Sequence, residues 1–323
     1  MSLNRKIIVT GGTGFIGGAL LTRLVARGDR SVLAWIRRVD SALPVGVVPV
    51  VPSFNRVFAA GSPVESLDVV VHCAARVHVM RDTAVDPLAE FRKVNVDLTL
   101  ELARGAVAAG AKRFIFLSTV KVNGESTGPG LAFKGGDTPQ PMDPYAVSKL
   151  EAERELCSLA DQTGLEVVII RVPLVYGPGV RANFRSMMRW LSVGLPLPLG
   201  GLDNKRSLVA LGNLVDLIDT CIDHPAAANQ TLMVCDGEDL SISELLRRLA
   251  AALGRPARLL AIPNGWLAMV ARLLGREDVH ARLCGSLQVD MSKTQELLGW
   301  TPPVRVDDAL AETARDYLNQ SRS

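Results

Sequence analysis

A tyrosine and a lysine lie four residues apart in DPYAVSKLEAE, residues 143–153. The chain contains only three tyrosines, so this pairing has few chances to arise by accident. Residues at this spacing share one face of a helix. A phenol, whose pKa is ordinarily about 10, is a poor acid–base catalyst at neutral pH, but a nearby ammonium favours its ionised form. Tyr145 and Lys149 are therefore candidates for proton transfer, although an ordinary amphipathic helix would also contain them.

The element that must hold this pair is a helix beginning near residue 143. Asp143 is a favoured N-cap residue, and Pro144 is favoured at the first helical position. We expect a helix over 143–163, with the pair at its N-terminal end, where the helix dipole favours an anion. The predicted position thus suits a phenolate.

A second chemical signal is the glycine-rich segment VTGGTGFIGGALL, residues 9–21. It joins an expected strand at 6–10 to an expected helix at 15–28, which is the context that a dinucleotide-binding turn requires. Glycines permit the tight turn and let a pyrophosphate approach the backbone, and the helix start offers free N–H groups. The candidate cofactor-binding residues of this turn are Gly11, Gly14, Phe15, Ile16 and Gly17.

The type of dinucleotide depends on the end of the second strand. An acidic residue there binds the ribose 2′-hydroxyl of NAD, whereas arginine accepts the 2′-phosphate of NADP. The segment WIRRVD, residues 35–40, has Arg37 and Arg38 at this point. We therefore expect NADP, and Asp40 keeps NAD open.

Strand-like and helix-like segments alternate through the first half of the chain, which is typical of a doubly wound parallel α/β sheet, a Rossmann fold. The expected strands are 6–10, 31–38, 68–75, 113–119 and 166–171, and the expected helices are 15–28, 88–109 and 143–163. Pro- and Gly-rich connections then indicate a smaller α+β lobe. We predict a dinucleotide-binding domain over 1–171, to which a strand near 231–236 returns, and a mainly substrate-binding lobe over 172–323.

The composition excludes several other classes of protein. A net charge of +3 is too small for a nucleic-acid binder that neutralises many phosphates. Five cysteines without a CxxC pair indicate neither a metal site nor a disulfide framework, so we expect a cytoplasmic protein. No apolar stretch reaches the roughly eighteen residues that span a bilayer. The apolar segment 265–275 is expected to pack on the lobe, with a membrane-surface helix as the alternative.

Several motifs in order resemble those of the extended short-chain dehydrogenase/reductases, in particular the sugar-nucleotide epimerase, dehydratase and ketoreductase group. The matching segments are TGGTGFIG (10–17), DVVVHCAA (68–75), NVDLTLELARGAVAAGAKRFIFLST (95–119), YAVSK (145–149), RVPLVYGPG (171–179) and SKTQELLGWTPPV (292–304). They are distributed along most of the chain, from residue 10 to residue 304. The resemblance also implies a homodimer formed through the two long helices, 88–109 and 143–163.

The resemblance assigns roles to the chemical residues. Tyr145 exchanges a proton with a sugar hydroxyl or ketone, and Lys149 also holds the nicotinamide ribose. In LSTVKVNG, residues 117–124, Thr119 takes the position whose hydroxyl hydrogen-bonds the reacting oxygen. His72 is expected to be a structural, hydrogen-bonded histidine. The other cofactor contacts that the resemblance implies are Ala74, Ala75, Asn95, Ser118 and Val172.

The chain departs from the family pattern beside Thr119. The 4,6-dehydratases of the group carry Asp and Glu after this threonine, and this chain has Val120 and Lys121 instead, which argues against elimination of water. Asn123 replaces the tyrosine of the usual VYG turn. For the substrate, the resemblance implies contacts from Asn183 in GPGVRANF and contacts to a diphosphate from the residues Arg206 and Arg282.

The leading prediction is a UDP-sugar 4-ketoreductase. The tracts HCAARVHVM (72–80), STVKVNGE (118–125) and SLQVDMSK (286–293) resemble bacterial enzymes that reduce a UDP-4-keto-6-deoxy-N-acetylhexosamine to UDP-N-acetylquinovosamine for O-antigen synthesis. The alternative is a UDP-hexose 4-epimerase, acting on UDP-glucose or UDP-GlcNAc with retained NAD. A catalytically silent NADP sensor is the third hypothesis, which the presence of both Tyr145 and Lys149 disfavours.

Overall fold

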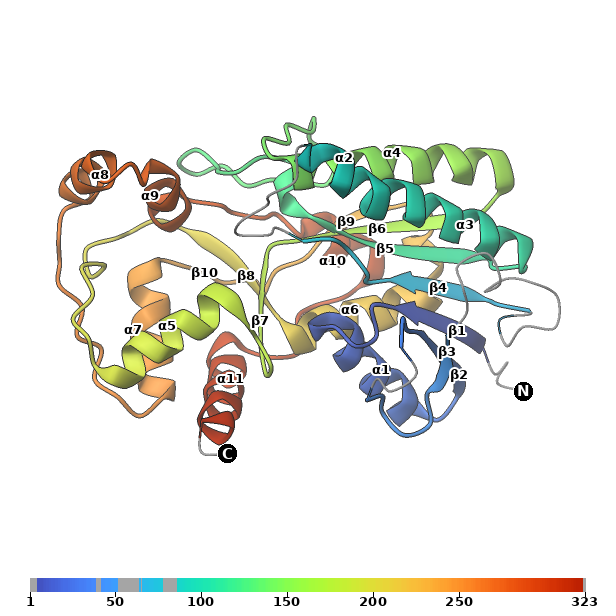
Figure 1. The fold of residues 1–323 in the computed structure, drawn as a ribbon, viewed down its shortest axis with the longest axis horizontal. Helices are drawn as coiled ribbons and strands as arrows, with labels where there is room; N and C mark the ends of the chain where they lie inside the picture. Colours follow the sequence, from blue (N-terminus) through green and yellow to red (C-terminus); the bar gives the residue numbers. More distant parts are fainter. Residues whose placement is uncertain (1–4, 39–41, 52–63, 65, 78–85, 322–323) are drawn as a thin grey trace.

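A seven-stranded parallel sheet forms the centre of the protein (Figure 1). In this computed structural model, the described residues are 5–38, 42–51, 64, 66–77 and 86–321. The strand order is β3-β2-β1-β4-β5-β6-β9. Their bounds are β1 Arg5–Thr10, β2 Arg30–Trp35, β3 Val48–Val50, β4 Val69–His72, β5 Arg113–Thr119, β6 Glu166–Val172 and β9 Thr231–Met233. The predicted doubly wound α/β fold is confirmed.

Helices cover both faces of this sheet (Figure 1). On one side lie α1 (Phe15–Arg27) and α6 (Leu211–Asp223), and on the other lie α2 (Pro87–Arg92), α3 (Leu98–Ala108) and α4 (Pro144–Thr163). The apolar run of β1 serves both faces, because Ile7 and Val9 join the core under α1 and α6, whereas Ile8 joins the core under α3 and α4. A strand buried on both sides needs such a continuous apolar run.

Two predicted elements differ in detail from the structure. The strand expected over 31–38 ends at Trp35, so the two arginines that follow lie in the connection beyond it. The helix expected over 88–109 is divided by a π-helical turn, η2 (Lys93–Asp97), between α2 and α3. Apolar periodicity does not distinguish a single π turn from a continuous helix, and such turns are frequent at functional sites.

A second layer of structure lies beside the large sheet, on the left in Figure 1, whereas α10 (Ser292–Leu298) packs against β9 of the large sheet. The three-stranded sheet of the second layer has the order β10-β8-β7, with the bounds β7 Leu174–Tyr176, β8 Arg206–Ala210 and β10 Asp239–Leu240. The other helices are α5 Ala182–Val193, α7 Ile242–Ala252, α8 Asn264–Leu273, α9 Glu277–Cys284, α10 Ser292–Leu298 and α11 Val306–Gln320; short 3-10 turns are η3 Val120–Val122 and η4 Pro225–Ala227. In the described part of the chain, none of the helices has the length and apolar character needed to cross a membrane. The domain boundary at 171/172 stays a prediction.

Candidate active site

The turn between β1 and α1 has room only for glycine at two of its positions. Gly11 has φ of 69°, and a Cβ atom there would lie 2.8 Å from the backbone nitrogen of Ala74. A Cβ atom on Gly17 would lie 2.3 Å from the carbonyl oxygen of Gly11. Gly14 is the N-cap of α1, and no side chain caps this helix. The first N–H groups of α1 therefore face outward without a side chain over them, as a pyrophosphate site requires.

The neighbouring cofactor candidates lie at the same edge of the sheet. Ala74 and Ala75 follow the end of β4, and the Ala74 N–H donates to Thr10 Oγ1 at 3.3 Å. Arg37 and Arg38 are exposed just beyond β2. Because β1, β2 and β4 are parallel neighbours, their carboxyl ends meet at this edge, where open α/β sheets bind ligands. Asp40 lies outside the described residues.

The N-terminus of α4 is held by an ion pair that the sequence analysis missed. Asp143 caps the helix by accepting a hydrogen bond from the Ala146 N–H at 2.6 Å. Lys121 Nζ lies 2.7 Å from Asp143 Oδ2 and 2.9 Å from Glu125 Oε1. Burial acts to lower the pKa of Lys121, but the hydrogen bonds with Asp143 and Glu125 outweigh it and raise that pKa. Lys121, one of the residues that depart from the dehydratase pattern, thus links the end of β5 to α4.

Tyr145 and Lys149 both lie on α4, as predicted, but their electrostatics differ from the prediction. Burial, together with the Asp143 charge, raises the pKa of Tyr145 to about 12. Lys149 is 1% exposed, and its Nζ lies 3.8 Å from the centre of the Phe116 ring. Burial lowers the pKa of Lys149 to about 7, against the charge of Glu153. Without a bound cofactor, desolvation therefore favours the neutral form of both groups.

The two hydroxyls at the end of β5 have different surroundings. Ser118 donates a hydrogen bond to the buried carboxylate of Glu153. Thr119 is the last residue of β5, pairs in register with Val172 of β6, and accepts a hydrogen bond from the Lys121 N–H at 3.3 Å. The Ser118 hydroxyl thus uses its proton in a buried hydrogen bond. Thr119 keeps a donor proton for a substrate oxygen.

A buried ion pair lies one helical turn beyond Lys149. Arg171 Nη2 lies 2.6 Å from Glu153 Oε2, and Arg171 Nε donates to Glu153 Oε1 at 3.1 Å. Arg171 Nη1 also donates to Asn123 Oδ1 at 3.1 Å, and Asn123 Nδ2 donates to the carbonyl of Lys134 at 2.9 Å. Asn123, which replaces the tyrosine of the family pattern, therefore connects Arg171 to the segment at Lys134. The only signal in the sequence was that Glu153 follows Lys149 at the same four-residue spacing.

His72 is a structural residue, which confirms the prediction for it. Its Nδ1 hydrogen-bonds Thr10 Oγ1 at 2.7 Å, and its Nε2 hydrogen-bonds Thr99 Oγ1 at 3.0 Å. Burial, aided by the Lys149 charge, lowers its pKa to about 3, so the ring is neutral at ordinary pH. Asn95, in the π turn, accepts from the Arg76 N–H at 2.9 Å and donates to the Arg76 carbonyl at 3.1 Å. Its cofactor contact stays a prediction.

The predicted substrate residues lie on three separate elements of the second layer. Arg206, at the start of β8, donates through Nη1 to the carbonyl of Gly285 at 2.9 Å. Burial lowers the pKa of Arg206, against the Glu125 charge. Asn183 is exposed in the first turn of α5. Arg282 lies in α9, and its side chain is outside the described part of the structure.

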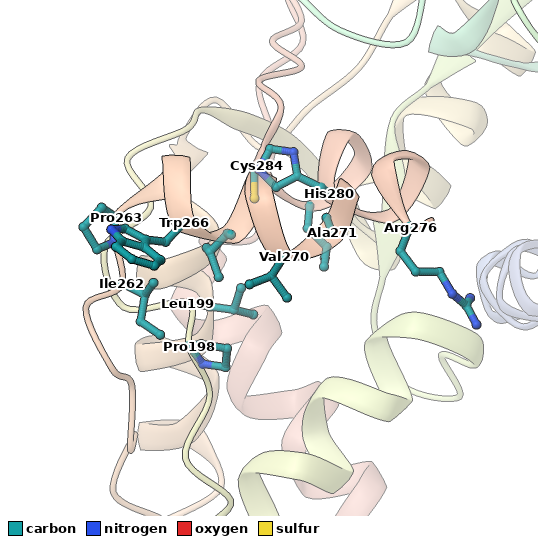
Figure 2. A pocket seen from close by; sticks show the side chains of 12 residues that line it. Pro198, Leu199, Ile262, Pro263, Trp266, Val270, Ala271, Arg276, His280 and Cys284 are labelled. Atoms are coloured by element: carbon teal, nitrogen blue, oxygen red, sulfur yellow. The ribbon is translucent and has the colours of Figure 1, made fainter. Parts of the chain in front are cut away.

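A cavity of about 610 Å³ opens beside α8 and α9, in the second layer of structure (Figure 2). Its walls are Pro198, Leu199, Ile262, Pro263, Trp266, Leu267, Val270, Ala271, Arg276, His280, Leu283 and Cys284. Neither Tyr145, Lys149 nor Thr119 belongs to these walls. Within the described residues, no group of three or more His, Cys, Asp or Glu side chains is placed to hold a metal ion.

Comparison with known proteins relates this geometry to a family. Residues 7–235 match the model of the NAD dependent epimerase/dehydratase family. A UDP-glucose 4-epimerase from Vibrio cholerae is 46% identical over 97% of this chain and 96% of its own. The structure of MoeE5 in complex with UDP-glucose and NAD matches with a TM-score of 0.75 and 26% identity, over 98% of this chain and 100% of that chain. UDP-N-acetylglucosamine 4-epimerase from Bacillus cereus, 21% identical with a TM-score of 0.78 over 98% and 99% of the chains, shares the fold.

These similarities correct the leading functional prediction. The expected reduction of a UDP-4-keto-6-deoxy-N-acetylhexosamine is contradicted, because the full-length relative at 46% identity is a UDP-glucose 4-epimerase. They favour the epimerase alternative, and they give no support to a preference for NADP. They confirm the resemblance seen in the motifs. The chain belongs to the NAD dependent epimerase/dehydratase family, within the sugar-nucleotide group of the extended short-chain dehydrogenase/reductases.

Proposed function

We propose that this protein is a UDP-hexose 4-epimerase that interconverts UDP-glucose and UDP-galactose with NAD. The observation that carries the proposal is the 46% identity to a UDP-glucose 4-epimerase along nearly the whole of both chains. The arrangement of Tyr145 and Lys149 on α4, with Thr119 at the end of β5, supports it. So does the absence of the dehydratase carboxylates, since Lys121 is held in ion pairs with Asp143 and Glu125.

The glycine turn is the proposed site of the NAD pyrophosphate. Gly11, Gly14 and Gly17 leave the start of α1 open, and the N–H groups of Phe15 and Ile16 face the phosphates. Arg37 and Arg38, at the end of β2, lie where the adenosine ribose is bound in this fold. Ala74, Ala75, Asn95, Ser118 and Val172 remain the other proposed cofactor-side residues. When bound, NAD supplies a hydride acceptor that also returns the hydride.

The protein residues handle the proton that accompanies each hydride. Tyr145 must first lose its phenol proton, for which the neutral amine of Lys149 is the acceptor. The phenolate then takes the proton of the C4 hydroxyl as this carbon is oxidised to a ketone, and it returns the proton when the ketone is reduced from the opposite face. Thr119 hydrogen-bonds the C4 oxygen throughout. Lys149 binds the nicotinamide ribose and, with its pKa lowered by burial to about 7, can exchange a proton near neutral pH.

The substrate diphosphate is the proposed partner of Arg206. This guanidinium is partly buried beside the segment at Gly285, where desolvation strengthens its interaction with phosphate. Asn183 and Arg282 are proposed to contact the same ligand from α5 and α9. A cytoplasmic homodimer formed through the helical segment from α2 to α3 and through α4 is part of the proposal, and analytical ultracentrifugation tests the dimer.

The direct test is to incubate the purified protein with UDP-glucose and follow the appearance of UDP-galactose by NMR. We expect interconversion without net consumption of NADH or NADPH, and NAD released on denaturation. UDP-GlcNAc is the second substrate to assay. Tyr145→Phe should abolish turnover, whereas Tyr317→Phe, on the distant helix α11, should not. Absence of interconversion with both sugar nucleotides in the NAD-loaded protein would refute the proposal.

A further inference from the structure

Helix α8 presents an apolar stripe to solvent. Trp266, Met269, Val270 and Leu273 recur at the i, i+3, i+4 and i+7 positions that place residues on one helix face. Their exposed fractions are 61%, 47%, 47% and 79%. Such a stripe normally faces the core of a globular protein, yet no residue of α8 is buried. The packing role expected for this segment is therefore only partly fulfilled, through Leu267, which packs against the core of the second layer.

The apolar surface extends beyond the stripe. Leu274, after the end of α8, is 69% exposed, and Leu260, in the segment that leads into the helix, is 54% exposed. Beneath the helix lies the cavity of about 610 Å³, and Trp266 and Val270 of the stripe are among its walls (Figure 2). Among the residues that line the cavity, Arg276 and Trp266 lie at opposite ends (Figure 2). We call the stripe with Leu260 and Leu274 the α8 face.

The segment of the chain that contains α8 carries an excess of positive charge. Residues 255–282 contain five arginines and two acidic residues, an excess of three positive charges. This excess equals the net charge of the whole chain, +3, so the remaining residues are neutral in sum. Arg272 and Arg276, at the C-terminal end of α8, are exposed, and Arg272 Nε lies 3.8 Å from Glu277 Oε1. Arg255 and Arg258, in the segment before α8, are also exposed. The α8 face thus combines exposed apolar side chains with a local positive charge.

We propose that the α8 face docks on the surface of an anionic lipid bilayer, with α8 lying in the interface plane. Helices with an apolar stripe and flanking arginines bind there through apolar burial and attraction to acidic headgroups. Ten residues at 1.5 Å each give α8 a length of about 15 Å, half the thickness of a hydrocarbon core, so it lies on the membrane instead of crossing it. This inference is independent of the proposed epimerase activity.

A second copy of this chain is the competing occupant of the α8 face. In a two-fold symmetric dimer, the same patch would meet itself, so the arginines around each α8 would face those of the partner. Like charges brought together in this way oppose association. An anionic bilayer instead offers opposite charge to the same arginines, and for this reason the charge distribution favours lipid.

The experiment is flotation of the full-length protein with vesicles of phosphatidylcholine alone or mixed with 30% phosphatidylglycerol, a composition chosen to mimic an acidic leaflet. We expect binding to the acidic vesicles that weakens as salt is raised. Trp266→Ser combined with Leu273→Asp should reduce binding at least tenfold. Arg272→Gln combined with Arg276→Gln should reduce it about 25-fold on acidic vesicles, since each arginine near such a surface contributes roughly fivefold.

Val45→Asp is the matched control, because Val45 is an apolar residue that is 95% exposed on the large-sheet side of the molecule. It should leave flotation unchanged, and all variants should keep the wild-type circular dichroism and thermal midpoint. Failure of the wild type to float with acidic vesicles would overturn the proposal. So would equal flotation of the Trp266→Ser/Leu273→Asp variant, or a concentration-dependent dimer that this variant abolishes in the absence of lipid.

Discussion

Replacement of Glu153 by glutamine tests the buried ion pair that lies beneath the candidate active site. Glu153 and Arg171 are 3% and 4% exposed, and their side chains make three hydrogen bonds to each other of 2.6, 3.1 and 3.3 Å. Glu153→Gln removes the negative charge, and Arg171 stays buried with only neutral acceptors: the glutamine oxygen, Asn123 Oδ1 at 3.1 Å and the Gly135 carbonyl at 3.4 Å. The substitution thus leaves a positive charge without compensation.

The expected loss follows from this burial. Removing one partner of a buried ion pair costs about 3–5 kcal/mol, because the remaining charge stays desolvated. Glutamine retains one acceptor oxygen, so we expect the lower limit, about 3 kcal/mol. For a chain of 323 residues, the entropy of unfolding per residue converts this to a fall of about 4 °C in the thermal midpoint. A change in the thermal midpoint of this size is easily measured.

Glu151→Gln is the matched control on the same helix. Glu151 pairs with Arg92, but these side chains are 29% and 47% exposed, so the pair is solvated. Exposed pairs contribute about 0.2–1 kcal/mol, and the midpoint should fall by about 1.5 °C or less. The assay is calorimetry of the cofactor-free protein at pH 7, with Arg171→Met and the Glu153→Gln/Arg171→Met double variant completing a cycle. The reasoning fails if Glu153→Gln is no more destabilising than Glu151→Gln, or if the two buried substitutions are additive.

Three further predictions concern the site. Gly17→Ala should abolish NAD binding measured by calorimetric titration, because its Cβ would lie 2.3 Å from the Gly11 carbonyl; Gly18→Ala, with 3.4 Å to the nearest atom, should bind normally. Lys149→Met should raise the thermal midpoint of the cofactor-free protein at pH 7, and this gain should shrink towards pH 10. Between about pH 7 and the ordinary lysine pKa of 10.5, the unfolded wild type binds the Lys149 proton and the folded wild type does not, so protonation destabilises the folded state there. A pH-independent difference between the two proteins would contradict this. Lys121→Met should cost about 1 kcal/mol in urea unfolding through its lost ion pairs, and no loss would refute that link.

Local patterns in the chain were sufficient to predict most of the fold. The apolar run of β5, the glycine turn before α1 and the Asp143–Pro144 start of α4 are each specified by neighbours in sequence. They were predicted to within a few residues. The π turn η2 and the early end of β2 were not, because both depend on how neighbouring strands and helices pack and leave no mark on apolar periodicity.

The sequence by itself determined the family, the glycine turn and the placement of Tyr145 and Lys149 on one helix, since these follow from spacing within single elements. Only the tertiary structure decided their environment. Burial of Lys149 against Phe116, the Glu153–Arg171 pair and the Lys121–Asp143 link join residues from different elements. The exposure of the α8 face is likewise known only from the tertiary structure, because an apolar stripe has the same sequence pattern whether it faces a core or solvent. Desolvation and charge pairing depend on which distant residues meet, and chain spacing does not encode that.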